Sequence, residues 1–128
     1  MNPELRPATR ADIVAALRHL GHDEKIPNRV IAYTGRVDGK VIAVGGIAFY
    51  PSGGRVAFCD ISDEGRRFPL SLHRGARLVL KEARRFGVKR VVVMDGPEVH
   101  AKTPGWLAHL GFRRTLVGEG LPAFILEV

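Results

Sequence analysis

Hydrophobic and polar positions along this chain follow a helical period first and a strand period afterwards. Between Ile13 and Leu20 the apolar side chains recur every three or four residues, which predicts a helix. Thr9 and Asp12 have the spacing of a capping box at the start of this helix, and Gly21 is expected to end it. The first part of the chain is therefore predicted to carry one amphipathic helix.

Strand patterns surround this helix. The predicted strands are 5–8 before it and then 30–37, 40–50 and 55–61 after it. The pair Asp38-Gly39 is a strong two-residue hairpin signal, and the polar segment 22–28 is expected to be a loop. Gly45-Gly46 interrupts the return strand of the hairpin, which predicts a bulge or a close approach of another backbone.

A long helix is expected after the third strand of this meander. Five apolar residues fall at spacings of four and three and predict its buried stripe: Leu72, Ala76, Val79, Ala83 and Phe86. Gly87 is a good residue to end the helix, and the nearly all-apolar run 88–94 is typical of a buried, parallel strand. The apolar stripe predicts that this helix packs on a sheet.

The last part of the chain predicts a short helix and two strands. Thr103 is expected to cap the helix with Pro104 at its first position, and Leu110-Gly111 ends it. Residues 112–117 and 121–128 then read as closing strands. The whole order is β-α-β-β-β-α-β-α-β-β, which indicates an α/β (α+β) protein with a single domain over 1–128.

Composition narrows the class further. The chain has 128 residues, no apolar run near the ~20 residues that span a bilayer, and no apolar centre of a secretory signal at its start, so a cytoplasmic protein is expected. The single cysteine, Cys59, excludes an internal disulfide and is predicted to be a small buried side chain. His19 and His22 stand near Asp23, but no further ligand is in view and no metal site is predicted.

The positive charge is concentrated in one segment. Residues 66–90 hold seven arginines and two lysines against one acid, a net +8 within a chain of net charge +7. Four of the cations share one face of the predicted long helix: Arg74, Arg77, Lys81 and Arg84. This face suits an anionic partner such as phosphates, a nucleic-acid backbone or an acidic protein surface, and an ordinary solvated helix face is the alternative. Aromatic residues do not interleave with it, so base stacking is not expected.

Three stretches, in this order, carry a resemblance to a known family: LRPATRADI, ARRFGVKRVVV and WLAHLGFRR. Together they resemble the GCN5-related N-acetyltransferase (GNAT) superfamily, and the last is similar to its Tyr-x-x-x-Gly-Phe junction between helix and strand. The resemblance covers essentially the whole chain, including a weaker likeness to compact GNAT-like proteins of tailed phages. It implies a mixed, mostly antiparallel central sheet flanked by helices, with the family's second helix missing or reduced to 22–28.

The resemblance also implies where acetyl-CoA would bind. GNAT enzymes hold the cofactor pyrophosphate on backbone N–H groups at the start of the long helix, where the helix dipole favours phosphate. The family pattern Arg/Gln-x-x-Gly-x-Gly/Ala aligns with residues 67–72, so leucines replace both glycines and Pro69 removes one donor. A register on Arg74-Gly75-Ala76 is the alternative and shortens the helix by about one turn. The cofactor residues implied are Cys59, Asp60, Ile61, Arg66, Arg67, Phe68, Leu70, Ser71 and Leu72.

Catalytic groups follow from the same alignment. The tyrosine that often protonates the leaving thiolate in this family aligns with Leu107, which cannot donate a proton. His100 aligns with a frequent asparagine and could act as acid or base, although a surface histidine is the alternative. Asp60, Asp63 and Glu64 stand where the family places a general base, and Glu64 is the first choice over a solvated loop acid.

Three functions are compatible with this sequence. The first is an acyl-CoA-dependent N-acyltransferase that moves an acetyl group from acetyl-CoA to an unknown amine. The second is a non-catalytic GNAT-like protein that forms a homo-oligomer or a larger assembly, for instance in a phage particle, where it would be found in the host cytoplasm or virion. The third is a nucleic-acid binder that uses the basic helix, and no membrane partner is expected. Trp106 is predicted to pack in the core or in a cleft wall.

Overall fold

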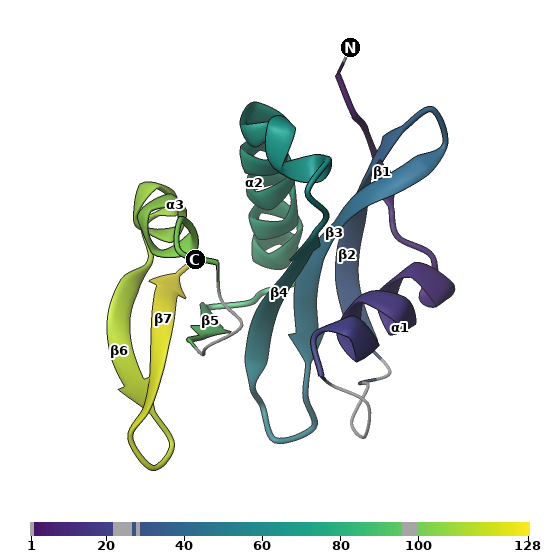
Figure 1. Cartoon of the computed structure of the whole chain (residues 1–128). Helices are drawn as coiled ribbons and strands as arrows, with labels where there is room; N and C mark the ends of the chain where they lie inside the picture. Colours follow the sequence, from purple (N-terminus) through teal and green to yellow (C-terminus); the bar gives the residue numbers. More distant parts are fainter. Residues whose placement is uncertain (1, 22–26, 28, 96–99) are drawn as a thin grey trace.

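The computed structural model describes residues 2–21, 27, 29–95 and 100–128 of the chain. Within these residues it forms a seven-stranded sheet in the order β1-β2-β3-β4-β5-β7-β6 (Figure 1). The strands are β1 (Glu4–Pro7), β2 (Arg29–Val37), β3 (Lys40–Phe49), β4 (Arg55–Ile61), β5 (Arg90–Met94), β6 (Arg113–Val117) and β7 (Leu121–Glu127). The helices are α1 (Arg10–His19), α2 (Pro69–Arg85), α3 (Thr103–Leu110) and the short 3-10 helix η1 (Gly65–Arg67).

The predicted order of elements and the mixed sheet are both confirmed. Neighbouring strands run antiparallel throughout the described sheet except for β4 and β5, which are parallel. The predicted loop over 22–28, with His22 and Asp23, lies outside the described residues apart from Pro27. None of the helices in the described ranges is long and apolar enough to cross a membrane.

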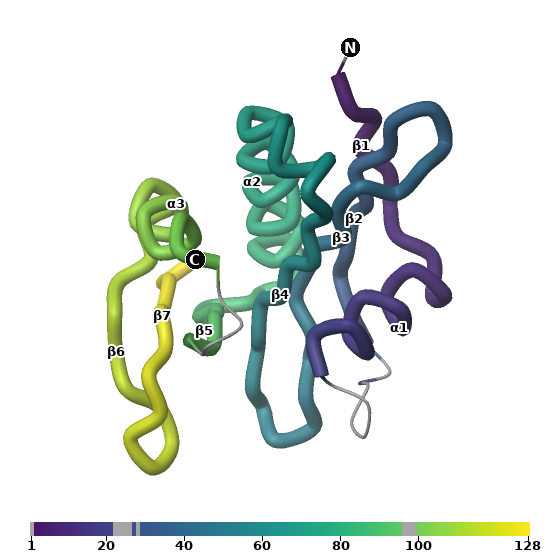
Figure 2. Tube along the Cα trace, in the orientation of Figure 1, coloured from purple at the N-terminus to yellow at the C-terminus, as the bar shows by residue number. Residues whose placement is uncertain are grey.

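Helices cover both faces of the sheet because its central strands are apolar on both sides. On one face Ile13 and Leu17 of α1 pack against Ala32, while the alternate residue Ile31 faces the cluster under α2 on the opposite side. The Cα trace in Figure 2 shows α1 and α2 on either side of the strands. This arrangement leaves α2 and α3 together on one face.

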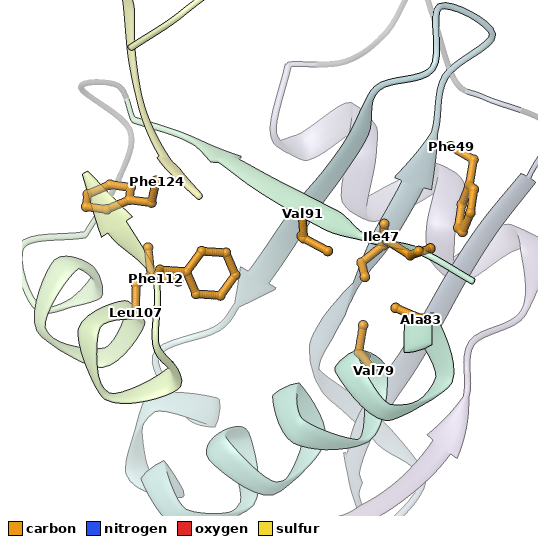
Figure 3. Packing of buried hydrophobic residues seen from close by; sticks show 9 residues of the cluster. Ile47, Phe49, Val79, Ala83, Val91, Leu107, Phe112 and Phe124 are labelled. Atoms are coloured by element: carbon orange, nitrogen blue, oxygen red, sulfur yellow. The ribbon is translucent and has the colours of Figure 1, made fainter. Parts of the chain in front are cut away.

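The main core lies between α2, α3 and the sheet. Figure 3 shows Ile47 and Val91 of the sheet near Val79 and Ala83 of α2. Ile47, Val91 and Ala83 have no exposed surface. Phe86 was predicted to extend this stripe, but it is 56% exposed because α2 ends before it. Its ring instead lies 5.5 Å from the guanidinium carbon of Arg29.

Two predicted boundaries are wrong for local reasons. Thr103 is the first residue of α3 rather than its cap, because the residue before it, Lys102, is already helical and makes no side-chain capping bond. Val88 is buried but precedes β5, because its N–H bonds to the carbonyl of Ala83 around Gly87, whose φ is +77°. This bond closes the end of α2 and delays the strand to Arg90.

The predicted capping box of α1 is confirmed. The Thr9 hydroxyl accepts from the Asp12 N–H and the Asp12 carboxylate accepts from the Thr9 N–H, both at 3.1 Å. Arg36 of β2 also donates to this carboxylate at 2.9 Å. The backbone hydrogen bond from Thr9 and the Arg36 charge lower the pKa of Asp12. The box therefore fixes both the start of α1 and its position against the sheet.

Of the two adjacent glycines in β3, Gly45 and Gly46, only Gly46 is required by the packing of the backbone. Strands β2 and β3 stay in register through Gly45 and Gly46, and their irregularity lies at Gly35-Arg36, so the predicted bulge at the pair is wrong. The alternative, a close backbone approach, is confirmed at Gly46, where an added Cβ would lie 2.1 Å from the carbonyl oxygen of Ile31. At Gly45 the nearest atom would be 3.6 Å away, an ordinary contact.

We expect Gly46→Ala to lower the free energy of unfolding by at least about 2 kcal/mol, because backbone atoms of β2 must move to admit the methyl group. Gly45→Ala is the matched control and should change stability by less than about 1 kcal/mol. Urea unfolding of the three proteins measures the difference. Equal stability of the two variants would contradict the close packing of β2 on Gly46.

Candidate functional site

The parallel strands β4 and β5 pair at only one position, Val56 opposite Val92. The other adjacent strands in the described sheet pair at four or more positions. After Val92, β5 continues to pair with β7, and the N–H of Asp95 bonds to the carbonyl of Pro122. Residues 57–61 of β4 therefore follow β3 while β5 follows β7, and the two strands separate. The gap leaves one edge of β4 without a paired strand.

A cavity of about 140 Å³ lies under α2 and reaches this gap. Residues on both sides of the gap, Ala57 and Cys59 of β4 and Val93 of β5, line it. Trp106 and Leu107 of α3 form a wall. Small residues of the sheet and of α2 face the cavity: Gly35, Ala43, Gly45, Ala57, Ser71, Gly75 and Ala76. The cavity exists because small side chains on the sheet lie beneath small side chains on the helix.

The turn from β4 into α2 presents free backbone donors. The N–H groups of Arg66, Arg67 and Phe68 bond to carbonyls within the turn, and the first helical bond runs from the N–H of Leu72 to the carbonyl of Phe68. Pro69 has no N–H, so the N–H groups of Leu70 and Ser71 remain without a partner inside the helix. These two donors lie at the N-terminus of α2, which is the positive end of the helix dipole.

The two leucines that replace the family glycines point in different directions. Leu70 is 81% exposed and extends into solvent, while Leu72 is half-buried and lines the cavity with Phe68 and Ser71. The side chain of Leu70 is therefore not packed into the cavity. Leu72 fills part of the cavity and leaves the remaining volume open.

Cys59 differs from its predicted role as a buried side chain, because it is exposed on the free edge of β4. Its thiol lies over Gly45, where an added Cβ would be 3.8 Å from the sulfur. The surrounding protein atoms and the carboxylate of Asp60 raise the pKa of the Cys59 thiol to about 12, against the opposing charge of Arg66. The raised pKa keeps the thiol protonated at neutral pH. Arg66 and Arg67 are both exposed.

The predicted carboxylates lie away from the cavity. Asp60 alternates with Cys59 along β4, and its carboxylate accepts a hydrogen bond from His19 Nδ1 at 2.9 Å on the α1 side of the sheet. Glu64 lies 3.1 Å from the ammonium group of Lys40, and Asp63 is exposed. Among the residues that the structure describes, none of these three acids lines the cavity. Ile61, the other predicted cofactor residue of this strand, is half-buried.

His100 is exposed and holds the start of α3. Its Nδ1 accepts from the N–H of Lys102 at 3.1 Å, and its carbonyl accepts from the N–H of Thr103 at 2.9 Å. Thr103 lines the cavity, so His100 lies one turn from the cavity wall. Leu107, which aligns with the family tyrosine, is buried in the core and offers no proton.

Trp106 forms part of the cleft wall, as predicted, and reveals a residue that the sequence pattern did not indicate. Its indole N–H donates to Nδ1 of His73 on α2 at 3.3 Å. This bond joins α2 to α3 beside the cavity. The signal was present in the sequence, because a packed tryptophan needs an acceptor for its N–H, but the pattern did not show which helix would supply it.

The basic face of α2 borders an open groove. His73, His109 and Leu126 contribute to the lining of this groove. Four cations of α2 also line it: Arg74, Arg77, Lys81 and Arg84. All four are exposed, and none belongs to an ion pair formed within the described ranges. The predicted charged face therefore lies on the outer side of α2, and the apolar cavity lies on its inner side.

Known structures share this architecture. An N-acetyltransferase from Staphylococcus aureus aligns over 99% of both chains with a TM-score of 0.71 at 10% identity. An acetyltransferase from Bacillus subtilis, solved in complex with CoA, covers 98% of this chain and 99% of its own, with a TM-score of 0.68 at 11% identity. An IAA acetyltransferase from Bacillus cereus covers 98% of this chain and 99% of its own, with a TM-score of 0.68 at 12% identity.

The chain has the GNAT-superfamily fold. No family model and no curated protein matches the sequence. The sequence identities to the known structures are low, so these matches establish the fold and leave the activity to be argued from the site.

Because only the thiolate reacts, the Cys59 thiol should react with Ellman's reagent at pH 8 about a hundredfold more slowly than an ordinary cysteine, even after allowing for the greater nucleophilicity of a high-pKa thiolate. The rate should still rise with pH up to pH 10, since the pKa is about 12. The urea-unfolded chain is the control and should react at the ordinary rate. A native rate that levels off near pH 9 would contradict the raised pKa.

Proposed function

We propose that this protein is an acyl-CoA-dependent N-acyltransferase that transfers an acyl group from the CoA thioester to an amine. The observation that carries the proposal is the free edge of β4, which lies over a cavity and next to the start of α2. Neighbours with the same fold include acetyltransferases, one of them in complex with CoA. The acceptor amine is not specified by these features.

The start of α2 supplies a place for the cofactor diphosphate. Leu70 and Ser71 offer backbone N–H groups at the positive end of a 17-residue helix. Arg66 and Arg67 add two exposed guanidinium groups that pair well with phosphate oxygens. Two leucines in place of glycines narrow the approach, but Leu70 extends into solvent, while Ser71 is buried and lines the cavity.

The free edge of β4 supplies a place for the extended arm of CoA. Alternate backbone groups of 57–61 point into the gap, where β5 no longer pairs with them. An extended chain that contains amides can pair with such an edge as an added strand. Paired in this way, the arm would run from the start of α2 toward Ala57, and the thioester would lie at the mouth of the cavity.

The transfer needs few groups from the protein. The neutral amine nitrogen attacks the thioester carbonyl carbon, a C–N bond forms, and the C–S bond breaks as the thiolate of CoA leaves. A thiol pKa near ~8.5 makes this thiolate an adequate leaving group without full protonation. Backbone N–H groups of the β4 edge can stabilise the oxyanion that develops on the carbonyl oxygen. The amine proton passes to solvent or to a nearby base.

Of the two predicted acid–base residues, His100 is the better placed. It begins α3, whose Thr103 and Trp106 line the cavity. Its Nδ1 accepts from the N–H of Lys102, so the neutral ring carries its proton on Nε2 and takes up the amine proton at Nδ1, in place of the bond from Lys102. Glu64 is held by Lys40 above the β2–β3 turn and would need to leave that ion pair to act as a base. We propose His100 as the acceptor of the amine proton.

A second candidate function is anion binding by the groove beside α2. Four exposed cations without ion-pair partners in the described structure favour it, since each phosphate contact would displace counterions. The acyltransferase and the anion-binding functions use opposite faces of α2. They can therefore be tested separately.

Acetyl-CoA should stabilise the folded chain. At a ligand concentration of 100 times Kd, one-site binding raises the free energy of unfolding by about 2.7 kcal/mol. Thermal unfolding with acetyl-CoA, with free CoA and with adenosine as control measures this effect. The absence of any shift at millimolar acetyl-CoA would contradict the proposed function.

Replacing Arg66 and Arg67 by alanine should weaken CoA binding by about tenfold or more, because charge-assisted contacts to phosphate are lost. Arg18 of α1 and Arg113 of β6 are exposed and lie on other elements, so the double variant Arg18→Ala/Arg113→Ala is a matched control that also removes two charges. Calorimetric titration with CoA compares the variants. An equal loss in the control would assign the effect to net charge alone.

A further inference from the structure

The cavity under α2 is larger than an acetyl group requires. Its volume of about 140 Å³ is close to that of an engineered apolar cavity of about 150 Å³ in another protein, which binds benzene. On this comparison it has space for about six carbon atoms. An acetyl group has two. The excess volume needs an explanation in terms of what the site binds.

The space results from residue choices that the backbone does not require. Gly45 of the sheet and Gly75 of α2 both have ordinary negative φ values, and an added Cβ at either would meet its nearest atom at 3.6 Å. Alanine is sterically possible at these positions. At Gly46, by contrast, the backbone admits no side chain. The chain therefore keeps small side chains around the cavity where larger ones would fit.

The lining of the cavity selects an apolar occupant. Among the described residues that line it, none carries a charge. No buried side-chain nitrogen or oxygen in the described structure lacks a hydrogen-bond partner, and the polar part of the lining consists of the uncharged side chains of Tyr33, Thr34, Cys59, Ser71, Thr103 and Trp106. A cationic amine would lose its hydration in this space without a compensating negative charge. An aliphatic chain loses nothing and leaves water.

The cavity is continuous with the site of the thioester. Ala57, Cys59 and Val93 line both the gap between β4 and β5 and the cavity behind it. An acyl group attached to CoA at the mouth of the gap has its tail directed inward beneath Gly75 and Ala76. The acyl end of the donor, and not the amine acceptor, is the part that this volume can take.

We propose that the cavity binds the tail of an aliphatic acyl group of about six carbons, so that the preferred donor is a medium-chain acyl-CoA rather than acetyl-CoA. This inference rests on the proposed function, because the CoA moiety places the tail. It adds the class of acyl-CoA that the protein uses as donor. It also assigns the selection of acyl-chain length to the small residues Gly45, Ala57, Gly75 and Ala76.

Hexanoyl-CoA and acetyl-CoA test the proposal on the full chain. Each methylene buried in an apolar pocket increases affinity several-fold, so hexanoyl-CoA should bind at least about tenfold more tightly than acetyl-CoA. Trp106 is the single tryptophan of the chain and lines the cavity. Its fluorescence should change with hexanoyl-CoA and much less with acetyl-CoA at equal saturation.

A matched pair of variants assigns the effect to the cavity. Ala76→Leu fills it from α2, and Ala108→Leu makes the same change on the exposed side of α3, with nearly equal helix propensity. Ala76→Leu should reduce the affinity for hexanoyl-CoA to that for acetyl-CoA, while Ala108→Leu should retain the tenfold preference. Gly45→Val fills the cavity from the sheet and serves as the second filling variant if Ala76→Leu does not fold.

The outcomes separate this inference from the proposed function. If acetyl-CoA and hexanoyl-CoA bind the unaltered chain equally well, the donor class is wrong while the acyltransferase proposal stands. If both filling variants keep the preference for hexanoyl-CoA, the cavity is not the acyl site and the proposal is overturned. If no CoA thioester binds, the proposed function fails and this inference fails with it.

Discussion

The separation of β4 from β5 is the constraint on which the rest of the site depends. Each strand has an extended antiparallel partner on its other side, β3 for β4 and β7 for β5, and the two strands pair with each other only at Val56 and Val92. The sheet therefore consists of two parts whose strand pairing is limited to one position. The gap exposes backbone donors, opens the cavity and lies beside the start of α2, so a single feature of strand pairing brings together the three parts of the site.

The turn before α2 shows how such a site can persist without glycines. Glycine permits close approach because it has no side chain, but a larger residue interferes only if its side chain points at the ligand. Leu70 extends into solvent and Leu72 lines the cavity, and the N–H groups of Leu70 and Ser71 have no partner within the helix. The two leucines change the shape of the cavity more than they change the backbone hydrogen-bond donors. This is consistent with a different acyl-CoA as the acyl donor rather than with loss of cofactor binding.

The fold could be predicted from the sequence because each element carries its own local signal. The capping box at Thr9, the Asp38-Gly39 hairpin and the stripe through Val79 and Ala83 specify elements without reference to the rest of the chain. The site could not be predicted in the same way, because it depends on contacts between distant elements. The bond between Trp106 and His73, and the position of Asp60 on the α1 side of the sheet, follow from tertiary packing and strand register. Even the exposure of Cys59 depends on where β5 leaves β4.

Amide hydrogen exchange at residues 57–61 tests most directly whether the β4 edge is open and binds the donor. In the free chain the amides that bond to β3 should exchange slowly and those that point into the gap should exchange fast. Saturation with CoA should then slow the fast group without changing the slow one. If every amide of 57–61 is already protected in the free chain, or if bound CoA leaves the fast amides unchanged, the gap between β4 and β5 is not the binding site.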